Sequence, residues 1–578
     1  MQQTAGDSAR RPVLLLIGWD GATPELLLRF ARAGKLPTVA RLMQAGSFRR
    51  LRSTVPPVTA CAWSSFLTGK NPGKHGLFDF VTPHPNSYKF AYTHGGYRRG
   101  RGGDLLALLN RAGLRVGCVN VPMTYPPRAI DGFLVSGLDA PDESSGIACP
   151  AEVFAQAQAE VGPYRIDNRH LGSMKDGADR RRVLDEFKRI ETRRTDVALA
   201  MMRHVPVDIL ILVYNATDQV QHHFWHLMEP QTCAYPGTDA AMAALFQHAI
   251  EEVYAHCDAE LARWLELFPQ ANLMLISDHG AGPVCGPQVR LNSALAEAGL
   301  LTWAQTKGTF LSDAAAGLDR FLRRTLTAEQ KAKLTRLLPA GRTRIEALSL
   351  PTIDWQRTVA FAYEGFTLSP CIWINRRDRF PEGIVGPGEE YERACARVIE
   401  ALGRLTDPKT GVAVIPHVYR SAEVYHGDYT SGAPDLILDW WEGATFTMAK
   451  SHPKLNGQPV VFYPTQPARA GQDITGIHRR DGVLVAAGPQ WAALDSAQAP
   501  PADLTDIAPT ALALLGVEVP ADMDGRVLTD MIRAPVATGR HAAGPTAPPA
   551  AAPAEEVRAY SERDQRRIVE RLSDLGYM

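Results

Sequence analysis

The chain has 578 residues, and its 62 lysines and arginines balance its 62 aspartates and glutamates. This length predicts one large domain with insertions, or two domains, and the balanced charge gives no indication of a nucleic-acid polymer or an anionic membrane surface as a partner. No apolar stretch approaches the roughly 20 residues that cross a bilayer, and residues 13–17 are too short for a signal-peptide core, so we expect a cytoplasmic protein without a membrane span.

Short runs of valine, isoleucine and leucine alternate along the chain with amphipathic helical stretches. This alternation is typical of a parallel sheet covered by helices on both faces, so the sequence predicts the α/β class. Strands are expected at residues 13–18, 115–120, 132–136, 207–213, 273–277 and 482–487. Helices are expected at residues 25–33, 104–112, 180–203, 239–267 and 506–515.

The later part of the chain departs from this alternation. Residues 302–352 are rich in leucine, alanine, lysine and arginine at helical spacing, which predicts a helical insertion. Residues 353–470 have strand and helix candidates of their own and predict a cap-like subdomain. The candidates are residues 371–374, 390–402 and 434–438. The other expected parts are a catalytic core at 11–301 closed by 471–534, an Ala/Pro-rich linker at 535–556 and a C-terminal helix within 557–578.

Three of the predicted strands lead into residues of the types that bind metal ions. The first leads to Asp20, and the fifth leads to Asp278 and His279. After the fourth, Asp218 and His222 are four residues apart, which puts both side chains on one face of a helical turn. Ligands of open α/β sheets collect beyond the carboxyl ends of the strands, and carboxylates with imidazoles suit zinc or a similar divalent ion. The sequence therefore predicts one shared metal site.

Each of these residues also fits a structural role when it is taken singly. Asp20 fits a helix N-cap, the Asp278-His279 pair fits a turn, and polar pairs four residues apart are common on solvated helix faces. His478 is expected in a loop just before the last predicted strand, where a histidine by itself indicates nothing. Only the combination of these residues points to a metal site.

Thr59 is a candidate nucleophile. Two prolines keep residues 56–57 extended, and residues 60–67 can begin a helix, so Thr59 is predicted at or near the helix N-cap. A hydroxyl at this position is either an ordinary capping group or, beside two cations, a readily deprotonated nucleophile. In the second case the neighbouring backbone N–H groups would hold a phosphate.

The order of the motifs along the chain is specific. A Gly-x-Asp-Gly turn contains Asp20, and Thr59 is followed nine residues later by Thr-Gly and then by Pro-x-x-His-Gly. Asp-x-x-x-His, Asp-His-Gly and a late Gly-x-His come after them. Over residues 13–528 this order resembles the alkaline phosphatase superfamily, and within it the type I phosphodiesterase/nucleotide pyrophosphatase branch. The resemblance implies a doubly wound, mostly parallel sheet with helices on both faces, together with the insertion and the small cap.

The resemblance also implies two divalent metal ions, zinc first and manganese as the alternative. The implied ligands are Asp20, Asp278, His279 and Thr59 for one ion, and Asp218, His222 and His478 for the other. Thr59, as a metal-bound alkoxide, is implied to attack phosphorus and form a phosphothreonine, which a water on the second ion then hydrolyses. The expected activity is the hydrolysis of a small-molecule phosphoester of the phosphodiester or nucleotide pyrophosphate type.

The residues after Thr59 depart from the family pattern. Nucleotide pyrophosphatases carry Phe-Pro-Asn there, for contacts to a nucleobase and to phosphoryl oxygens, whereas this chain has Ala60-Cys61-Ala62, so neither contact is predicted. Ala60 and Trp63 are candidate substrate contacts, although a buried packing role also fits Trp63. A phosphoryl transferase or phosphomutase and a metal-binding protein without turnover remain alternatives. A sulfatase fits least, because sulfatases carry a cysteine at the position of Thr59.

Overall fold

The structure is a computed structural model. It describes residues 12–84, 86–92, 103–168, 174, 176–230, 238–304, 353–364, 369–442, 446–455, 457–464, 474–494, 499–533 and 560–574. Nearly all of the expected helical insertion and the whole of the expected Ala/Pro-rich linker lie outside these residues. Among the described helices, none combines the length and the apolar character that crossing a bilayer requires.

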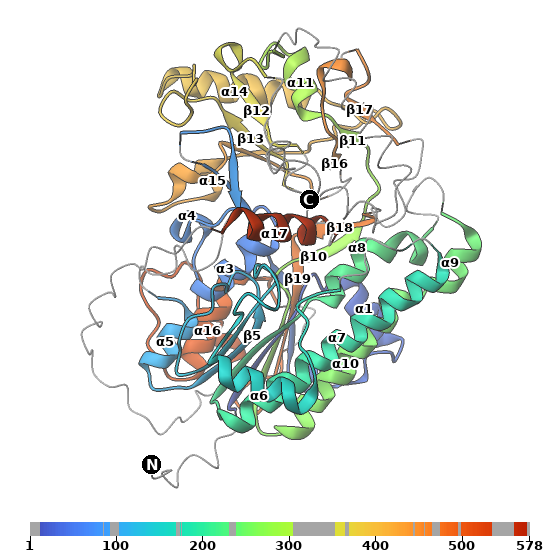
Figure 1. Ribbon diagram of the computed structural model, residues 1–578, viewed down its shortest axis with the longest axis vertical. Coiled ribbons are helices and arrows are strands. Elements are labelled where there is room, and N and C mark those ends of the chain that lie inside the picture. The colour runs from blue at the N-terminus through green and yellow to red at the C-terminus, as the bar shows by residue number, and fades with distance from the viewer. Residues whose placement is uncertain are drawn as a thin grey trace.

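A nine-stranded sheet forms the centre of the molecule, in the order β20-β2-β19-β9-β1-β8-β5-β6-β7 (Figure 1). The strands are β1 (Leu14–Trp19), β2 (Ser47–Arg52), β5 (Val116–Val121), β6 (Gly132–Ser136), β7 (Ala148–Cys149), β8 (Ile209–Tyr214), β9 (Asn272–Ile276), β19 (Asp481–Ala487) and β20 (Ala502–Asp503). The stretch from β9 to β6 is entirely parallel, whereas β19 runs antiparallel to both of its neighbours and β7 antiparallel to β6. The predicted α/β class with a mostly parallel sheet is confirmed.

Helices cover both faces of this sheet because alternate side chains of its strands point to opposite faces. Leu15 and Ile17 of β1 belong to one hydrophobic cluster, and Leu14 and Leu16 belong to the other. The first cluster is covered by α1 (Pro24–Arg32), α2 (Pro37–Ala45), α6 (Ala151–Val161), α7 (Gly177–His204), α8 (Ala216–Met228) and α10 (Ala249–Leu267). The second is covered by α3 (Thr59–Thr68), α5 (Leu105–Arg111) and α16 (Ile507–Leu514).

The single long helix expected at residues 239–267 is two helices, which corrects that prediction. The first is α9 (Ala240–Phe246), and α10 begins at Ala249. The ring of Phe246 packs near the ring of Phe224 on α8, with 5.9 Å between the centroids, whereas α10 packs along α7 and α8. Both segments thus pack against α8, and the chain between them leaves the helical conformation at residues 247–248.

A smaller antiparallel sheet forms a cap above the central sheet (Figure 1). Its order is β12-β13-β15-β14, and its strands are β12 (Ala360–Ala362), β13 (Cys371–Ile374), β14 (Val418–Arg420) and β15 (Leu436–Leu438). Helices α11 (Leu291–Glu297) and α14 (Glu389–Gly403) pack with this sheet around a third hydrophobic cluster. The strand and helix candidates of the expected cap are thus present, and α11 from the preceding segment packs with them.

The C-terminal helix α17 (Glu562–Asp574) packs against the loop that follows β6 and the segment that follows α6. The guanidinium of Arg571 lies 2.6 Å from Asp167 and donates to the carbonyl of Pro141 at 3.1 Å. Just before the helix, the hydroxyl of Tyr560 donates to the carbonyl of Asp139 at 2.8 Å. These contacts attach the end of the chain to the part of the molecule that contains the central sheet.

Candidate metal centre and nucleophile

The carboxyl ends of the adjacent strands β9, β1 and β8 meet at one edge of the central sheet. Asp20 directly follows β1, Asp278 comes two residues after β9, and Asp218 lies in the first turn of α8, just beyond β8. Because parallel strands end on the same side, the three carboxylates converge as the sequence predicts. The predicted site residues are all buried, with exposed fractions of 0 or 1%: Asp20, Thr59, Asp218, His222, Asp278, His279 and His478.

Asp20 and Asp278 each have one anchored carboxylate oxygen and one oxygen that accepts no hydrogen bond. The indole N–H of Trp63 donates to Asp20 Oδ2 at 3.0 Å, and the backbone N–H of Gly21 donates to Asp278 Oδ1 at 3.2 Å. Asp20 Oδ1 and Asp278 Oδ2 are buried and accept no hydrogen bond from any described residue. Since burying a carboxylate oxygen without a partner is costly, this arrangement fits a bound cation.

The three histidines are oriented by backbone carbonyls. Nδ1 of His222 lies 2.8 Å from the carbonyl oxygen of Gly476, and Nδ1 of His478 lies 2.8 Å from that of Pro57. Nδ1 of His279 lies 3.0 Å from the carbonyl oxygen of the next residue. A carbonyl only accepts hydrogen bonds, so each Nδ1 carries the hydrogen and each Nε2 presents a lone pair. Metal-binding histidines are held in this way by their other ring nitrogen.

The imidazoles of His222 and His478 converge on the carboxylate of Asp218. Oδ1 of Asp218 lies 3.3 Å from His222 Nε2 and 3.6 Å from His478 Nε2, and the two Nε2 atoms are 3.1 Å apart. Two lone pairs at this distance repel each other unless a proton or a metal cation lies between them. The group therefore has the donor atoms and the closeness of a divalent metal site.

His279 lies between the two groups of ligand-type side chains. Its donor nitrogen comes within 4.8 Å of donor atoms of Asp20 and Asp278, and also of Asp218 and His478. The ring of His279 stacks on that of His478, with 3.7 Å between the centroids. The structure thus brings the predicted ligands into one continuous cluster, with His279 at its centre.

His478 lies in a strand rather than in the loop that the sequence predicts, which is a correction. This strand, β18 (Gly476–Arg479), pairs antiparallel with β10 (Gly280–Pro283) and sets His478 opposite Ala281. The sequence does not indicate this strand, because β18 has only four residues and these do not alternate between apolar and polar. Its strand conformation depends on a partner far away in the sequence, immediately after His279.

Thr59 is the first residue of α3, one position inside the N-cap residue Val58. Its hydroxyl oxygen lies 3.1 Å from His279 Nε2, and its side chain is fully buried. The first N–H groups of a helix have no acceptor within that helix, so the N–H of Ala60 is available to an anion beside the hydroxyl. The hydroxyl of Thr59 and the N–H of Ala60 thus lie together at the edge of the cluster of ligand-type side chains.

Hydrogen bonds made by side chains of α8 and α10 connect the loop after β1 to α8. The hydroxyl of Thr217 donates to the carbonyl of Asp20 at 2.6 Å, and the amide of Gln221 donates to the carbonyl of Gly21 at 2.8 Å. The hydroxyl of Tyr254 in turn donates to the amide oxygen of Gln221 at 3.1 Å. These bonds fix the spacing between Asp20 and the candidate ligands Asp218 and His222 on α8. Sequence patterns do not reveal them, because each joins segments that are far apart along the chain.

Gly21 permits the close approach of this loop to α8. Its φ of +67° lies in the left-handed region, and a Cβ atom there would come 2.7 Å from the carboxylate of Asp218. Both the backbone conformation and the space therefore require glycine.

The buried carboxylate of Glu191 on α7 caps the helix that carries Asp218. Its Oε1 accepts hydrogen bonds from the backbone N–H groups of Asn215 at 3.0 Å and Ala216 at 2.8 Å. Its other oxygen pairs with Arg194, which is also buried. Because the first N–H groups of a helix lack acceptors within it, this carboxylate holds the start of α8 in place.

The carboxyl groups of the cluster influence one another's ionisation. Burial, and then the neighbouring carboxylate of Asp278, raises the pKa of Asp20 well above its usual range. Burial raises the pKa of Asp278 to about 6, with Asp218 acting in the same direction and His279 against it. Burial also acts to raise the pKa of Asp218, but His222, His478 and His279 together outweigh it and hold this pKa below the usual range. Added positive charge would favour the ionised forms of Asp20 and Asp278, whose pKa values are raised.

Ala60 and Trp63, the two candidate substrate contacts, have fully buried side chains. The ring of Trp63 packs against that of Phe66, with 5.5 Å between the centroids. It also lies against β1, where a Cβ atom on Gly18 would come 2.5 Å from the indole ring. Its indole N–H donates a hydrogen bond to the carboxylate of Asp20. Trp63 therefore has no free face for stacking on a substrate, which corrects that expectation, and Ala60 offers a substrate only its backbone N–H.

We expect Trp63→Phe to raise the Kd for a divalent ion about 10- to 100-fold, because outer hydrogen bonds orient ligand carboxylates. The measurement is calorimetric titration of chelator-treated protein with zinc and with manganese. Trp491→Phe is the matched control, since Trp491 is buried in the same hydrophobic cluster and its N–H meets no acceptor among the described residues. Equal affinity losses in the two variants would contradict a specific role of Trp63.

The sequence matches a family model described as type I phosphodiesterase / nucleotide pyrophosphatase over residues 14–466. No curated protein matches the chain. Human ectonucleotide pyrophosphatase/phosphodiesterase 5 aligns with a TM-score of 0.46 and 12% identity, covering 90% of this chain and 100% of that one. Phosphonoacetate hydrolase from Sinorhizobium meliloti 1021, in complexes with phosphonoformate and phosphonoacetate, aligns with a TM-score of 0.48 and 12% identity, covering 88% of this chain and 96% of that one.

Proposed function

Because the chain belongs to the type I phosphodiesterase/nucleotide pyrophosphatase family of the alkaline phosphatase superfamily, we propose that it hydrolyses phosphoesters through a covalent phosphothreonine at Thr59. The observation that carries this proposal is the position of the Thr59 hydroxyl at a helix N-terminus, 3.1 Å from His279 in the buried ligand cluster. Phosphodiesters and nucleotide pyrophosphates are the proposed substrate types.

The buried carboxylate oxygens and imidazole Nε2 atoms fit two divalent cations. Asp20, Asp278 and His279, with Thr59, are proposed to hold one, and Asp218, His222 and His478 the other. Two such ions lower the pKa of a bound hydroxyl and offset the charge of a phosphoryl group in an in-line displacement. Zinc suits this nitrogen and oxygen donor set, and manganese is the alternative.

The residues of the chain then have distinct tasks in the two steps. The Thr59 oxygen forms a bond to phosphorus while the bond to the ester oxygen breaks, and the departing alcohol takes up a proton. The N–H of Ala60 at the start of α3 holds a phosphoryl oxygen. In the second step the oxygen of a water molecule bonds to phosphorus, the bond to Thr59 breaks, and the threonine hydroxyl regains its proton.

A substrate panel tests this function. It contains aryl phosphodiesters, phosphomonoesters, phosphonates, sulfates and dinucleotides, each assayed with zinc and with manganese. Turnover of phosphorus esters and none of sulfates is the expected result, whereas inactivity on every member would overturn the proposal. Addition of an acceptor alcohol distinguishes a transferase, because a transferase diverts the phosphoryl group from water to that alcohol.

A further inference from the structure

The cap reaches the candidate metal centre through Trp440, which follows β15 by two residues. The rings of Trp440 and His478 have 6.2 Å between their centroids, and the side chain of Trp440 is buried. Trp441 meets Trp440 edge to face at 5.9 Å and stacks on Tyr419 of β14, also at 5.9 Å. These three cap residues, which we call the aromatic wall, thus extend from His478 to Tyr419.

Arg480 of the core lies beside the far end of this wall. Burial, and then the carboxylate of Asp439, raises the pKa of Tyr419, whereas Arg480 acts on this pKa in the opposite direction. Arg480 comes two residues after His478, so the Cα atoms of these two residues are at most about 7 Å apart. One end of the wall therefore lies at the candidate metal centre, and the other end lies near a cation.

The guanidinium of Arg480 retains a hydrogen-bond donor. Its Nε is buried and has no acceptor among the described residues. The neighbouring Arg479 differs, because its guanidinium donates to the carbonyls of His478 at 3.1 Å and Pro283 at 2.7 Å. Of these two consecutive arginines, Arg479 therefore holds β18 to β10, and Arg480 has a donor for a ligand.

Three carboxylates of the cap also act on the phenol of Tyr419, and each of them is directed elsewhere. Asp439 accepts the two backbone N–H groups of the second and third residues after it, each at 3.3 Å. Glu423 accepts the backbone N–H of Arg420 at 2.7 Å, and Glu442 is exposed. Arg480 forms an ion pair with none of these described carboxylates, so its charge is available to a ligand.

Ser53 places a hydroxyl beside Arg480. The backbone N–H of Ser53 donates to the carbonyl of Arg480 at 2.8 Å, which continues the pairing of Arg52 with Asp481 at the end of β2. Directly opposite residues of an antiparallel pair have their side chains on the same face of the sheet. The hydroxyl of Ser53 is buried and forms no hydrogen bond with any described residue. A second polar group without a partner therefore lies on the face of Arg480.

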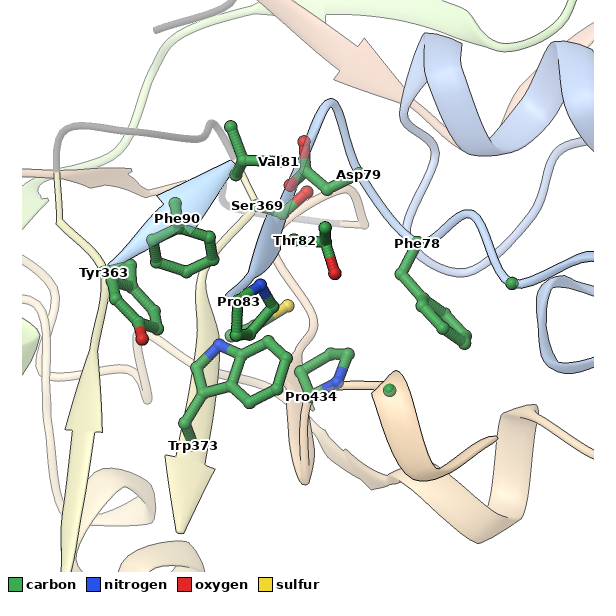
Figure 2. A pocket seen from close by; sticks show the side chains of 13 residues that line it. Phe78, Asp79, Val81, Thr82, Pro83, Phe90, Tyr363, Ser369, Trp373 and Pro434 are labelled. Atoms are coloured by element: carbon green, nitrogen blue, oxygen red, sulfur yellow. The ribbon is translucent and has the colours of Figure 1, made fainter. Parts of the chain in front are cut away.

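The cap is anchored on the segment that joins β2 to α3. The hydroxyl of Tyr425 donates to the carbonyl of Val55 at 2.8 Å, and the ring of Tyr425 packs on that of Phe78 with 4.9 Å between the centroids. Phe78 and Asp79 also line a pocket between the cap and a hairpin of the core (Figure 2). The strands of this hairpin are β3 (Val81–Pro83) and β4 (Phe90–Tyr92). The lining of the pocket includes no arginine and no residue of the aromatic wall, so the region around Arg480 is separate from it.

We propose that Arg480 and Ser53 bind a second anionic group of the substrate, a carboxylate or a phosphate, while the phosphoryl group under attack lies at Thr59. Buried donors without acceptors are costly, so a ligand that fits here presents acceptor oxygens. A guanidinium pairs with two oxygens of such an anion, and a serine hydroxyl donates to one of them. This step rests on the proposed function and narrows it, because it names phosphoesters with a second anionic group as the substrate class.

Binding is tested by calorimetry of the metal-loaded protein with phosphonopropionate and with its neutral amide, phosphonopropanamide. We expect the Kd for phosphonopropionate to be about tenfold lower than that for the amide, and Arg480→Gln to remove this difference. Ser53→Ala should reduce the difference, and Arg480→Lys should keep part of it. Arg52→Gln is the matched control, because Arg52 is exposed and its side chain points to the opposite face of β2. Equal Kd values in the wild type, a preference that survives in Arg480→Gln, or an equal loss in Arg52→Gln overturns the proposal.

A kinetic comparison separates this proposal from the proposed function. Three phosphodiesters share an aryl leaving group, and their second ester group ends in a carboxylate, a phosphate or a neutral carboxamide. We expect kcat/KM for an anionic ester to exceed that for the carboxamide about tenfold in the wild type and not in Arg480→Gln, and the better anion identifies the group that Arg480 binds. Turnover of all three esters without this preference defeats the assignment of Arg480 alone. Tighter binding of phosphonopropionate without turnover of any ester defeats the proposed function and leaves that assignment standing.

Discussion

Thr59→Ala is expected to lower kcat for phosphoester hydrolysis by at least about 10³-fold, since it removes the atom that bonds to phosphorus. The deleted hydroxyl lies 3.1 Å from His279 Nε2, whereas the carboxylates and the other imidazoles of the cluster keep their backbone and side-chain partners. Metal content is therefore expected to remain largely intact. The measurement pairs single-turnover kinetics with metal analysis of the same preparation.

Two further variants sharpen this test. Thr59→Ser keeps a hydroxyl at the start of α3 and should retain part of the activity. Thr68→Ala is the matched control, because Thr68 is a buried threonine of the same helix whose hydroxyl donates only to the carbonyl of Ser64. Mass spectrometry of acid-quenched enzyme should detect a phosphoryl group on the peptide that contains Thr59. Normal turnover by Thr59→Ala would show that another group attacks phosphorus.

The elements that carry most of the site could be predicted because their signals are local. The apolar runs that become β1, β8 and β9 lie directly before Asp20, Asp218 and Asp278, and parallel strands bring their carboxyl ends together. The position of Thr59 near a helix start follows equally from its neighbours in the sequence. Such predictions need only the period of the apolar residues and the composition of a short segment.

The features that were missed depend on contacts between distant segments. His478 lies in a strand only because β10 pairs with it, and Trp63 serves Asp20 because α3 packs beneath β1. The capping of α8 by Glu191 joins two elements that no local pattern connects. The pocket lined by Asp79 likewise combines a core hairpin with cap strands that come much later in the chain. One sequence contains no periodic signal for any of these pairings.

Removal of divalent ions is expected to abolish turnover and to lower the melting temperature, by an amount that grows between about pH 5 and pH 8. An ion present at roughly 1,000 times its Kd stabilises the folded state by about 4 kcal/mol. To bind, the ion must displace the protons of the buried carboxyl groups. Burial raises the pKa of Asp278 to about 6 and raises that of Asp20 as well, so both carboxyl groups retain protons in mild acid.

The sign of this pH dependence follows from proton linkage. A carboxyl group whose folded pKa is raised gives the metal-free protein stability that is fully present below its unfolded pKa of about 3.9. For Asp278 this contribution to the free energy of unfolding is lost as the pH rises through about 6. Above that pH a bound ion takes the place of the proton, so the ion stabilises the folded protein by more than it does in mild acid. Calorimetric melting of chelated and metal-loaded protein across this range measures the difference. Asp278→Asn should flatten it, whereas Glu364→Gln, which alters a buried cap carboxyl group whose pKa is also raised, should not. A ligand group that gives up a proton to the ion, whether a carboxyl group or an imidazole such as that of His222, links metal binding to pH in this window. A metal effect on the melting temperature that is equal at about pH 5 and at about pH 8 would therefore contradict the assignment of Asp278 as a ligand.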